Sequence, residues 1–251
     1  MIIFMTLLTK EIKRFLVVWE QTIIGPLVSA FLYELIFGHI FSTISSDLSN
    51  ISYTKFLIPG LVIMQVLMGS ITNSSSSIIL SKYHGNIIFL LMAPISPFTM
   101  MNAYLIACII RSIILSLVIF LGLACFSIVI PKSISLFILF IVLGSIISGG
   151  LGIIIGILTS SFNSSASIMS FIWTPLIYLS GIFYNINNFD PFWRKLASFD
   201  PIFYLVNGFR SLFINDPSVN VSLSLYVLMF FSLIIYLIGY FLIKNGVKLK
   251  N

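Results

Sequence analysis

Charged residues are scarce in this sequence: Asp, Glu, Lys and Arg together make up only 8% of 251 residues. A chain with so few charges and 59% hydrophobic residues has more apolar surface than a globule of this length can hide from water. A water-soluble globular protein is therefore excluded. The charge is also biased, because 13 Lys and Arg outnumber seven Asp and Glu. We interpret the excess cations as residues that set the membrane topology and attract anionic lipid, and we expect no nucleic-acid partner.

Residues that hold metals or carry out catalysis are equally few. His39 and His84 are the only histidines, and neither has Cys or acidic residues near it at metal-ligand spacing. Cys108 and Cys125 fall on one expected helix, about 25 Å apart along its axis, so they cannot bridge each other. The sequence contains no G-x-x-x-x-G-K-[ST] phosphate loop and no Ser/His/Asp set at a common depth. We therefore expect no metal, no bound cofactor and no catalytic residue in this chain.

Long apolar runs dominate what is present. Several approach the roughly 20 residues needed to span the hydrocarbon core of a bilayer. We predict an all-α polytopic membrane protein with six transmembrane helices and both termini on one side. The expected spans are Thr22–Phe41, Phe56–Leu80, Asn102–Phe126, Ser133–Leu158, Ser165–Tyr184 and Ser222–Ile243.

Flanking cations indicate which side holds the termini. Seven Lys and Arg lie on the side of the termini and five on the other, and the rule that cytoplasmic loops are basic places the termini in the cytoplasm. The seven are Lys10, Lys13, Arg14, Lys82, Lys244, Lys248 and Lys250, and the five are Lys55, Lys132, Arg194, Lys195 and Arg210.

Residues 1–20 have the pattern of an amphipathic helix that lies in the membrane interface. One face would carry polar residues and another apolar ones. These are Thr6, Thr9, Lys10 and Lys13 on the first face, and Leu8, Ile12, Phe15 and Trp19 on the second. A short cytoplasmic tail whose basic residues only fix orientation is the alternative. The basic cluster follows an apolar start rather than leading it, so no cleavable signal is expected.

Small residues recur at every fourth position of the fourth span and predict a close helix contact on that face. The neighbour could lie in this chain or in a second copy, and an internal contact is the simpler alternative. The residues are Gly144, Ser148, Gly152 and Gly156, followed by Ser160.

Two ionisable residues fall inside expected spans. Glu34 and Arg111 lie at similar depths when each is counted from the cytoplasmic end of its span. An unpaired charge at that depth costs roughly 2.5–3.5 kcal/mol on insertion scales, so we predict that the two form an ion pair. The pair could hold two helices in register or belong to a transport path.

The segment 180–210, SGIFYNINNFDPFWRKLASFDPIFYLVNGFR, concentrates aromatic residues between two apolar runs. Its aromatic residues favour the membrane interface, and Pro191 and Pro201 are suited to start short helices after Asp190 and Asp200. A soluble external loop is the alternative. The order of its residues resembles the carboxy-terminal signature of the permease subunits of type-2 ATP-binding-cassette (ABC) exporters. The matching residues are Ser180, Gly181, Phe183, Pro191, Trp193, Asp200, Pro201, Tyr204, Gly208 and Arg210.

A second stretch, SKYHGNIIFLLMAPISPF at residues 81–98, is similar to the cytoplasmic coupling loop of that family. The family usually has an acid beside a base at the start of this loop, where this chain has Ser81 and Lys82. Its apolar run predicts a short helix from about residue 85 to 93 that binds an ATPase subunit, and a helix lying on the inner leaflet is the alternative. The expected coupling residues are Gly85, Ile88, Phe89, Leu91 and Pro94.

The resemblance covers essentially the whole chain and implies one ABC type-2 transmembrane domain over residues 1–251. It implies a homodimeric permease in a bacterial-type inner membrane, with both termini in the cytoplasm and residues 185–221 as a re-entrant hairpin on the outer side. ATP and Mg would be used by a separate ATPase subunit, and a hydrophobic or amphiphilic substrate of the drug, lipid or glycan class would move outward.

Two other classes are kept beside this one. An ATP-independent channel or secondary carrier could use Glu34 and Arg111 to relay charge, although no inverted repeat of the carrier type is detectable. A membrane-embedded enzyme or a passive scaffold has no catalytic constellation in the sequence to support it.

Overall fold

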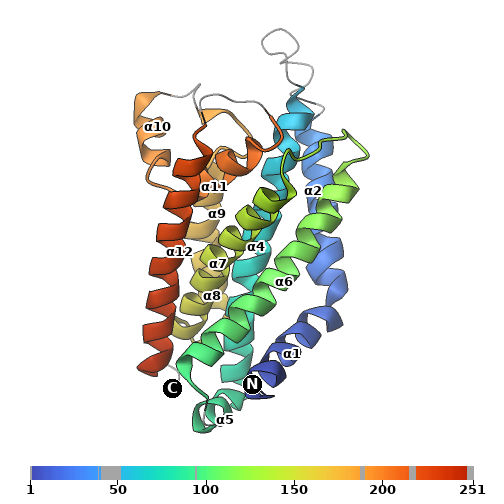
Figure 1. The fold of residues 1–251 in the computed structure, drawn as a ribbon. Helices are drawn as coiled ribbons and strands as arrows, with labels where there is room; N and C mark the ends of the chain where they lie inside the picture. Colours follow the sequence, from blue (N-terminus) through green and yellow to red (C-terminus); the bar gives the residue numbers. More distant parts are fainter. Residues whose placement is uncertain are drawn as a thin grey trace.

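The computed structural model describes residues 2–38, 40, 52–93, 95–186, 190–214 and 219–247. These residues form helices and connecting turns, and no strand occurs among them. Figure 1 shows long helices side by side, with α5 at one end of the bundle and α10 at the other. We call these the α5 end and the α10 end. Helix α1 begins and helix α12 ends at the α5 end, so the first and last described helices share one side.

The helical elements follow one another along the chain without strands between them. They are α1 (Ile2–Val17), η1 (Glu20–Ile24), α2 (Gly25–Tyr33), η2 (Glu34–Gly38), α4 (Tyr53–Tyr83), α5 (Asn86–Met92), α6 (Pro97–Leu123), α7 (Ile134–Leu158), α8 (Phe162–Ile168), η3 (Met169–Trp173), α9 (Thr174–Leu179), α10 (Pro191–Ala197), α11 (Pro201–Arg210) and α12 (Val221–Lys244), where η marks a π-helical stretch.

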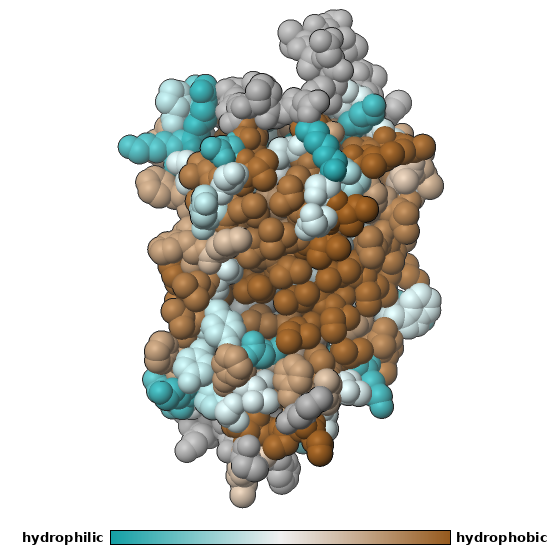
Figure 2. Space-filling model, in the orientation of Figure 1, coloured by the Kyte–Doolittle hydropathy of each residue, from teal (hydrophilic) through white to brown (hydrophobic). Residues whose placement is uncertain are grey.

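Five helical stretches in the described part are long and apolar enough to cross a membrane: Glu20–Gly38, α4, α6, α7 and α12. They correspond to five of the six expected spans. Figure 2 shows the broad apolar band that they create between two more hydrophilic ends.

The remaining expected span, Ser165–Tyr184, is not one of these five. Its place is taken by α8, η3 and α9 in direct succession, which end at Leu179. The first half of this stretch contains Asn163 and several serines, which lower its hydropathy. The six-span count is therefore not confirmed, although the chain is helical as far as Leu179 of the expected fifth span.

Polar side chains determine where several helices begin. The hydroxyls of Ser96, Ser133 and Ser161 accept hydrogen bonds from backbone N–H groups in the first turns of α6, α7 and α8. Asp200 and Asn220 do the same for α11 and α12. Proline follows Ser96 and Asp200 at the first helical position, where its missing N–H costs nothing.

Helix α4 lies at the centre of the bundle. It packs against α6, α7, α11 and α2, and it is the most buried of the five candidate spans. The stretch Glu20–Gly38 and helix α12 are the least buried, so they lie at the periphery. The core around α4 is therefore built mainly by α6 and α7.

The small-residue face of α7 contacts other helices of the same chain. A β-carbon added at Gly152 would lie 2.5 Å from the carbonyl oxygen of Ile71 on α4. Gly156 packs against the same helix one turn further on, while Gly144 packs against α11. Ser148, between them, is fully buried. Helix α7 ends at Leu158, so Ser160 is not part of this face.

Helix α1 packs against the bundle through a face that includes a charge. Leu7, Glu11 and Phe15 are buried, and α1 contacts α6. The polar residues expected on one face are exposed, as a helix with two faces requires. Glu11 was not expected in the buried face. Whether α1 lies in the membrane interface stays a prediction.

Candidate functional site

The chain turns sharply between α4 and α5. Gly85 has φ of +71°, a backbone conformation that favours glycine because a side chain would be strained there. Helix α5 follows, with Ile87 buried on its inner side. Ile88 and Met92 are 54% and 78% exposed, so their apolar side chains face away from the described bundle.

Two further apolar side chains flank this helix. Tyr83 at the end of α4 and Phe98 at the start of α6 are also largely exposed. We call Tyr83, Ile88, Met92 and Phe98 the α5 surface. Pro94 and the side chains of Phe89 and Leu91 lie outside the described part of the structure, so their coupling role stays a prediction.

The last turn of α4, just before α5, is attached to α7 by a lysine. The Nζ of Lys82 donates to the carbonyl oxygens of Ile157, at 2.5 Å, and Thr159, at 3.1 Å. These carbonyls belong to the carboxyl end of α7, where unpaired oxygens and the helix dipole favour a cation. Lys82 therefore fixes the start of the α5 segment relative to α7.

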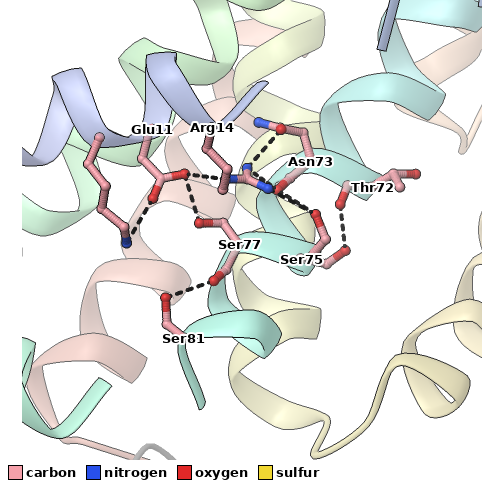
Figure 3. Close-up of polar contacts among 9 residues, drawn as sticks. Glu11, Arg14, Thr72, Asn73, Ser75, Ser77 and Ser81 are labelled. Carbon is pink, nitrogen blue, oxygen red and sulfur yellow. Dashed lines mark hydrogen bonds and ion pairs between the residues drawn. The ribbon is translucent and has the colours of Figure 1, made fainter. Parts of the chain in front are cut away.

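A buried polar network attaches α1 to α4 (Figure 3). The Nε of Arg14 lies 3.1 Å from Glu11 Oε2, and the same oxygen accepts a hydrogen bond from the Ser77 hydroxyl at 2.7 Å. Arg14 also donates to the backbone carbonyl and the side-chain oxygen of Asn73, both at 2.8 Å, and to Ser76 Oγ at 3.3 Å. We call these five residues the α1–α4 link.

The environment of Glu11 explains why this network is polar throughout. Glu11 is 1% exposed, and a buried carboxylate needs a cation and hydrogen-bond donors around it. Arg14 and Ser77 supply these on one oxygen, and Lys10 Nζ lies 3.2 Å from the other. The link therefore stabilises α1 against α4 near the α5 end.

Sequence reasoning missed this link, although one signal was present. Residues 72–77 of α4 read TNSSSS, an unusual run of polar residues inside a span. Polar residues within spans usually bond to a neighbouring helix or face a cavity. That signal says that a polar partner exists, but it does not say which helix provides it.

The expected ion pair between Glu34 and Arg111 is not formed. Arg111 donates to the carbonyl oxygens of Gly69 on α4 and Thr22 on η1. Glu34 lies beside Thr54 at the start of α4. Thr54 and Gly69 are about four turns apart on α4, or roughly 22 Å of helical rise. The structure thus corrects this expectation: the terminal nitrogens of Arg111 bind backbone carbonyls, and Glu34 lies elsewhere.

At the α10 end, one arginine joins the two ends of the sequence signature. Arg210 at the end of α11 donates through a single terminal nitrogen to the carbonyl oxygens of Gly181 and Ile182, both at 3.0 Å. Its Nε donates to the carbonyl of Phe56 on α4 at 3.1 Å, and its guanidinium lies 3.7 Å from the centre of the Phe56 ring. Arg210 is 7% exposed.

Two glycines of the signature occupy positions that disfavour a side chain. Gly181 has φ of +81°, which forms the turn after α9 that presents the carbonyls to Arg210. Gly208 packs against the ring of Phe140, where a β-carbon would come within 2.7 Å. The Tyr53 hydroxyl also donates to the next carbonyl, that of Phe183, at 2.7 Å. We call Arg210, Tyr53 and the carbonyls of residues 56 and 181–183 the Arg210 clasp.

Of the remaining signature residues, Ser180 is buried at the end of α9, and others lie on or beside α10 and α11. Pro191 and Pro201 begin these helices, as expected, and Trp193 is about half-exposed on α10. Asp200 caps α11 by accepting from the Ile202 N–H at 2.9 Å. Its other oxygen is buried without a partner among the described residues, and burial raises the pKa of Asp200 to about 7.

A polar stripe crosses the exposed side of the α8–η3 segment. Asn163, Ser167 and Ser170 recur at helical spacing and are exposed. Beside them on α4, the Thr72 hydroxyl is exposed and points to the sulfur of Met169 at 3.8 Å. We call Asn163, Ser167 and Ser170 the α8 stripe. Polar residues at such positions in a membrane protein usually face protein or water rather than lipid.

No cluster of three or more His, Cys, Asp or Glu side chains that could hold a metal occurs in the described part of the chain.

A family model described as "ABC-2 type transporter" matches residues 3–214. The chain belongs to the ABC-2 type transporter family. The match runs from α1 through α11, so the α5 surface, the α1–α4 link and the Arg210 clasp all lie within the ABC-2 region.

Curated relatives agree with this assignment. The inner membrane transport permease YadH of Escherichia coli K12 is 30% identical over 243 residues, which cover 96% of this chain and 94% of that protein. YadH of Shigella flexneri matches to the same extent. This chain is therefore a membrane-spanning ABC-2 permease, and permease subunits of the ABC-2 family are not themselves enzymes.

Proposed function

We propose that this ABC-2 permease is the membrane subunit of an ATP-driven exporter. Two copies would form the transport unit in the inner membrane, with the α5 end in the cytoplasm. A separate subunit would bind to that end and hydrolyse ATP with Mg, and a hydrophobic or amphiphilic substrate of the drug, lipid or glycan class would move outward. Membership of the family and the similarity to an inner membrane transport permease support this proposal.

The α5 surface is the observation that carries the proposal. Its side chains are exposed on α5 (Ile88 and Met92) and on the adjoining helix ends (Tyr83 of α4 and Phe98 of α6). A short apolar helix presented in this way suits the groove of a partner protein. The partner's movement would reach the bundle because Lys82 and the α1–α4 link attach the end of α4 to two neighbouring helices.

The α8 stripe supports an amphiphilic substrate. It lies on a segment of low hydropathy, next to the exposed Thr72 of the central helix. In the proposed dimer, hydroxyl and amide groups on this face would line a path that accepts polar portions of the substrate, while the surrounding apolar residues accept its hydrophobic portion.

Co-purification tests the partner directly. Replacing Ile88 and Met92 by Asp should abolish co-purification of an ATPase, because two charges would enter an apolar contact. The matched control is Ile130→Asp, which places a charge on a similarly exposed side chain between α6 and α7, away from α5. That variant should retain the ATPase.

Membrane insertion and the size of the purified particle should be unchanged in both variants. If the wild-type chain recovers no ATPase, or if the α5 variant retains it in full, the proposal is wrong in its central part. Export that persists without any ATPase would favour a channel or secondary carrier instead.

A further inference from the structure

Two segments that carry exposed polar groups, α4 and the segment from α8 to α9, are joined at the α10 end. Thr72 lies on α4, and the α8 stripe lies on the segment that ends in α9. Arg210 binds the first turns of α4 through Phe56, and it binds the turn that follows α9 through Gly181 and Ile182. One guanidinium group therefore connects α4 to the turn after α9 at the α10 end.

The site around Arg210 is built to hold this side chain. Gly60 on α4 leaves the space that the guanidinium occupies, because a β-carbon there would lie 3.1 Å from a terminal nitrogen of Arg210 and 3.1 Å from Ile182. The planar fork of arginine can donate in several directions at once, which the single ammonium group of lysine cannot do in the same geometry. Arg210 thus fits a slot between α4 and the turn after α9.

A second side chain acts on the same turn. Tyr53 donates to the carbonyl of Phe183, so three successive carbonyls, at residues 181, 182 and 183, accept hydrogen bonds from side chains of other elements. The Phe183 ring also lies against Tyr33 of α2 and Phe37 of η2, at 5.6 and 4.9 Å between ring centres. The turn after α9 is therefore attached to the first span, to α4 and to α11.

We propose that Arg210 is a positioning residue that keeps the α10 end of the transport path closed. While the Arg210 clasp is intact, the ends of α4 and α9 cannot separate. The path opens at this end when Arg210 releases the carbonyls of Gly181 and Ile182. This inference rests on the proposed function for the existence of a path, and it adds the device that closes it.

A leak measurement distinguishes a clasp from a structural contact. The full-length permease would be reconstituted into liposomes loaded with carboxyfluorescein, and dye release would be recorded without ATP or ATPase. We expect Arg210→Gln to release dye at least about tenfold faster than wild type, because losing hydrogen bonds from a charged group shifts an equilibrium by that factor or more.

Graded variants and a matched control accompany this measurement. Arg210→Lys keeps the charge without the fork and should leak less than Arg210→Gln. Tyr53→Phe should leak slightly, and its combination with Arg210→Gln should leak more than either single change. The control is Lys132→Gln, because Lys132 donates to the Ser211 carbonyl at the same end of the molecule without joining α4 to α9. This control should remain as tight as wild type.

Thermal unfolding and chromatography of each variant would show which proteins are folded. Folded Arg210→Gln and Tyr53→Phe variants that are as tight as wild type would overturn the inference, as would an equal leak from Lys132→Gln. If Arg210→Gln fails to fold, folded Arg210→Lys and Tyr53→Phe variants that are as tight as wild type would overturn the inference instead. The result is independent of ATPase co-purification, so a failure of the clasp and a failure of the proposed function are separate outcomes.

Discussion

Replacing Glu11 by Gln tests how much the α1–α4 link stabilises the protein. The change keeps the size of the side chain and removes its negative charge from a position that is 1% exposed. Arg14 then loses the carboxylate at 3.1 Å, and Ser77 loses a charged acceptor at 2.7 Å. Arg14 keeps its bonds to Asn73, so part of the guanidinium remains satisfied.

The expected magnitude follows from these contacts. Breaking a fully buried ion pair by removing one partner costs about 3–5 kcal/mol. Because Arg14 is partly exposed and keeps the Asn73 oxygens, we expect Glu11→Gln to lower the free energy of unfolding by about 2–3 kcal/mol. Lys10→Gln is the control: its side chain is 45% exposed, so its pair with Glu11 should contribute less than about 1 kcal/mol.

A double-mutant cycle measures the interaction itself. Denaturant unfolding in detergent would be followed for Glu11→Gln, Arg14→Gln and the double variant. The double variant should lose less stability than the sum of the two single variants, by at least about 1 kcal/mol, since each single change leaves the partner charge unpaired and the double change does not. Effects that add to within about 0.5 kcal/mol would refute the view that Glu11 and Arg14 interact.

Three further changes test other parts of the structure. Gly152→Ala should lower the free energy of unfolding by about 1–3 kcal/mol, because the new β-carbon meets the Ile71 carbonyl. Gly25→Ala should not destabilise the protein, because nothing lies within 4 Å of the added carbon. Denaturant titrations that rank the two variants the other way would contradict the packing of α7 against α4. Since the pKa of Asp200 is raised from 3.8 to about 7, the wild-type unfolding free energy should fall by up to about 4 kcal/mol as pH rises from 4 to above 7. Asp200→Asn should flatten this dependence, and an unchanged pH profile would be the contrary result. A single Cys at Ser198 should react slowly with an impermeant reagent applied from outside if α10 and α11 lie in the interface, while rapid complete labelling would indicate a solvated loop.

The helices themselves were predictable because their signals are local. Long, mainly apolar runs indicated five spans, and Pro191 and Pro201 marked the starts of α10 and α11. The fifth expected span was predicted less accurately for two reasons. The turn at Gly181 ends the helix before the apolar run ends, and the polar first half of the segment is not typical of a lipid-facing helix. Local composition does not show which face of a helix another segment will cover.

Contacts between distant residues could not be predicted in the same way. The pairing of Glu34 with Arg111 was inferred from depth counted along each span, and that count assumed that both spans begin at the same depth. The beginning of the first span already lies level with Arg111, so Glu34, 12 residues further on, lies roughly 18 Å away along the helix. Thr22, not Glu34, lies beside Arg111. The α1–α4 link was missed because nothing local tells that Glu11 faces inward on an amphipathic helix.

The proposed movement of this permease by ATP hydrolysis in a separate subunit can be measured through the accessibility of the α8 stripe. Ser170 would be replaced by Cys and the exposed Cys125 by Ser, and the complex with its ATPase would be reconstituted into nanodiscs. We expect thiol labelling of residue 170 to change during ATP turnover and to stay constant when either ATP or the ATPase is withheld. Labelling that is the same in all of these conditions, or that changes with no ATPase present, would contradict movement driven by the ATPase.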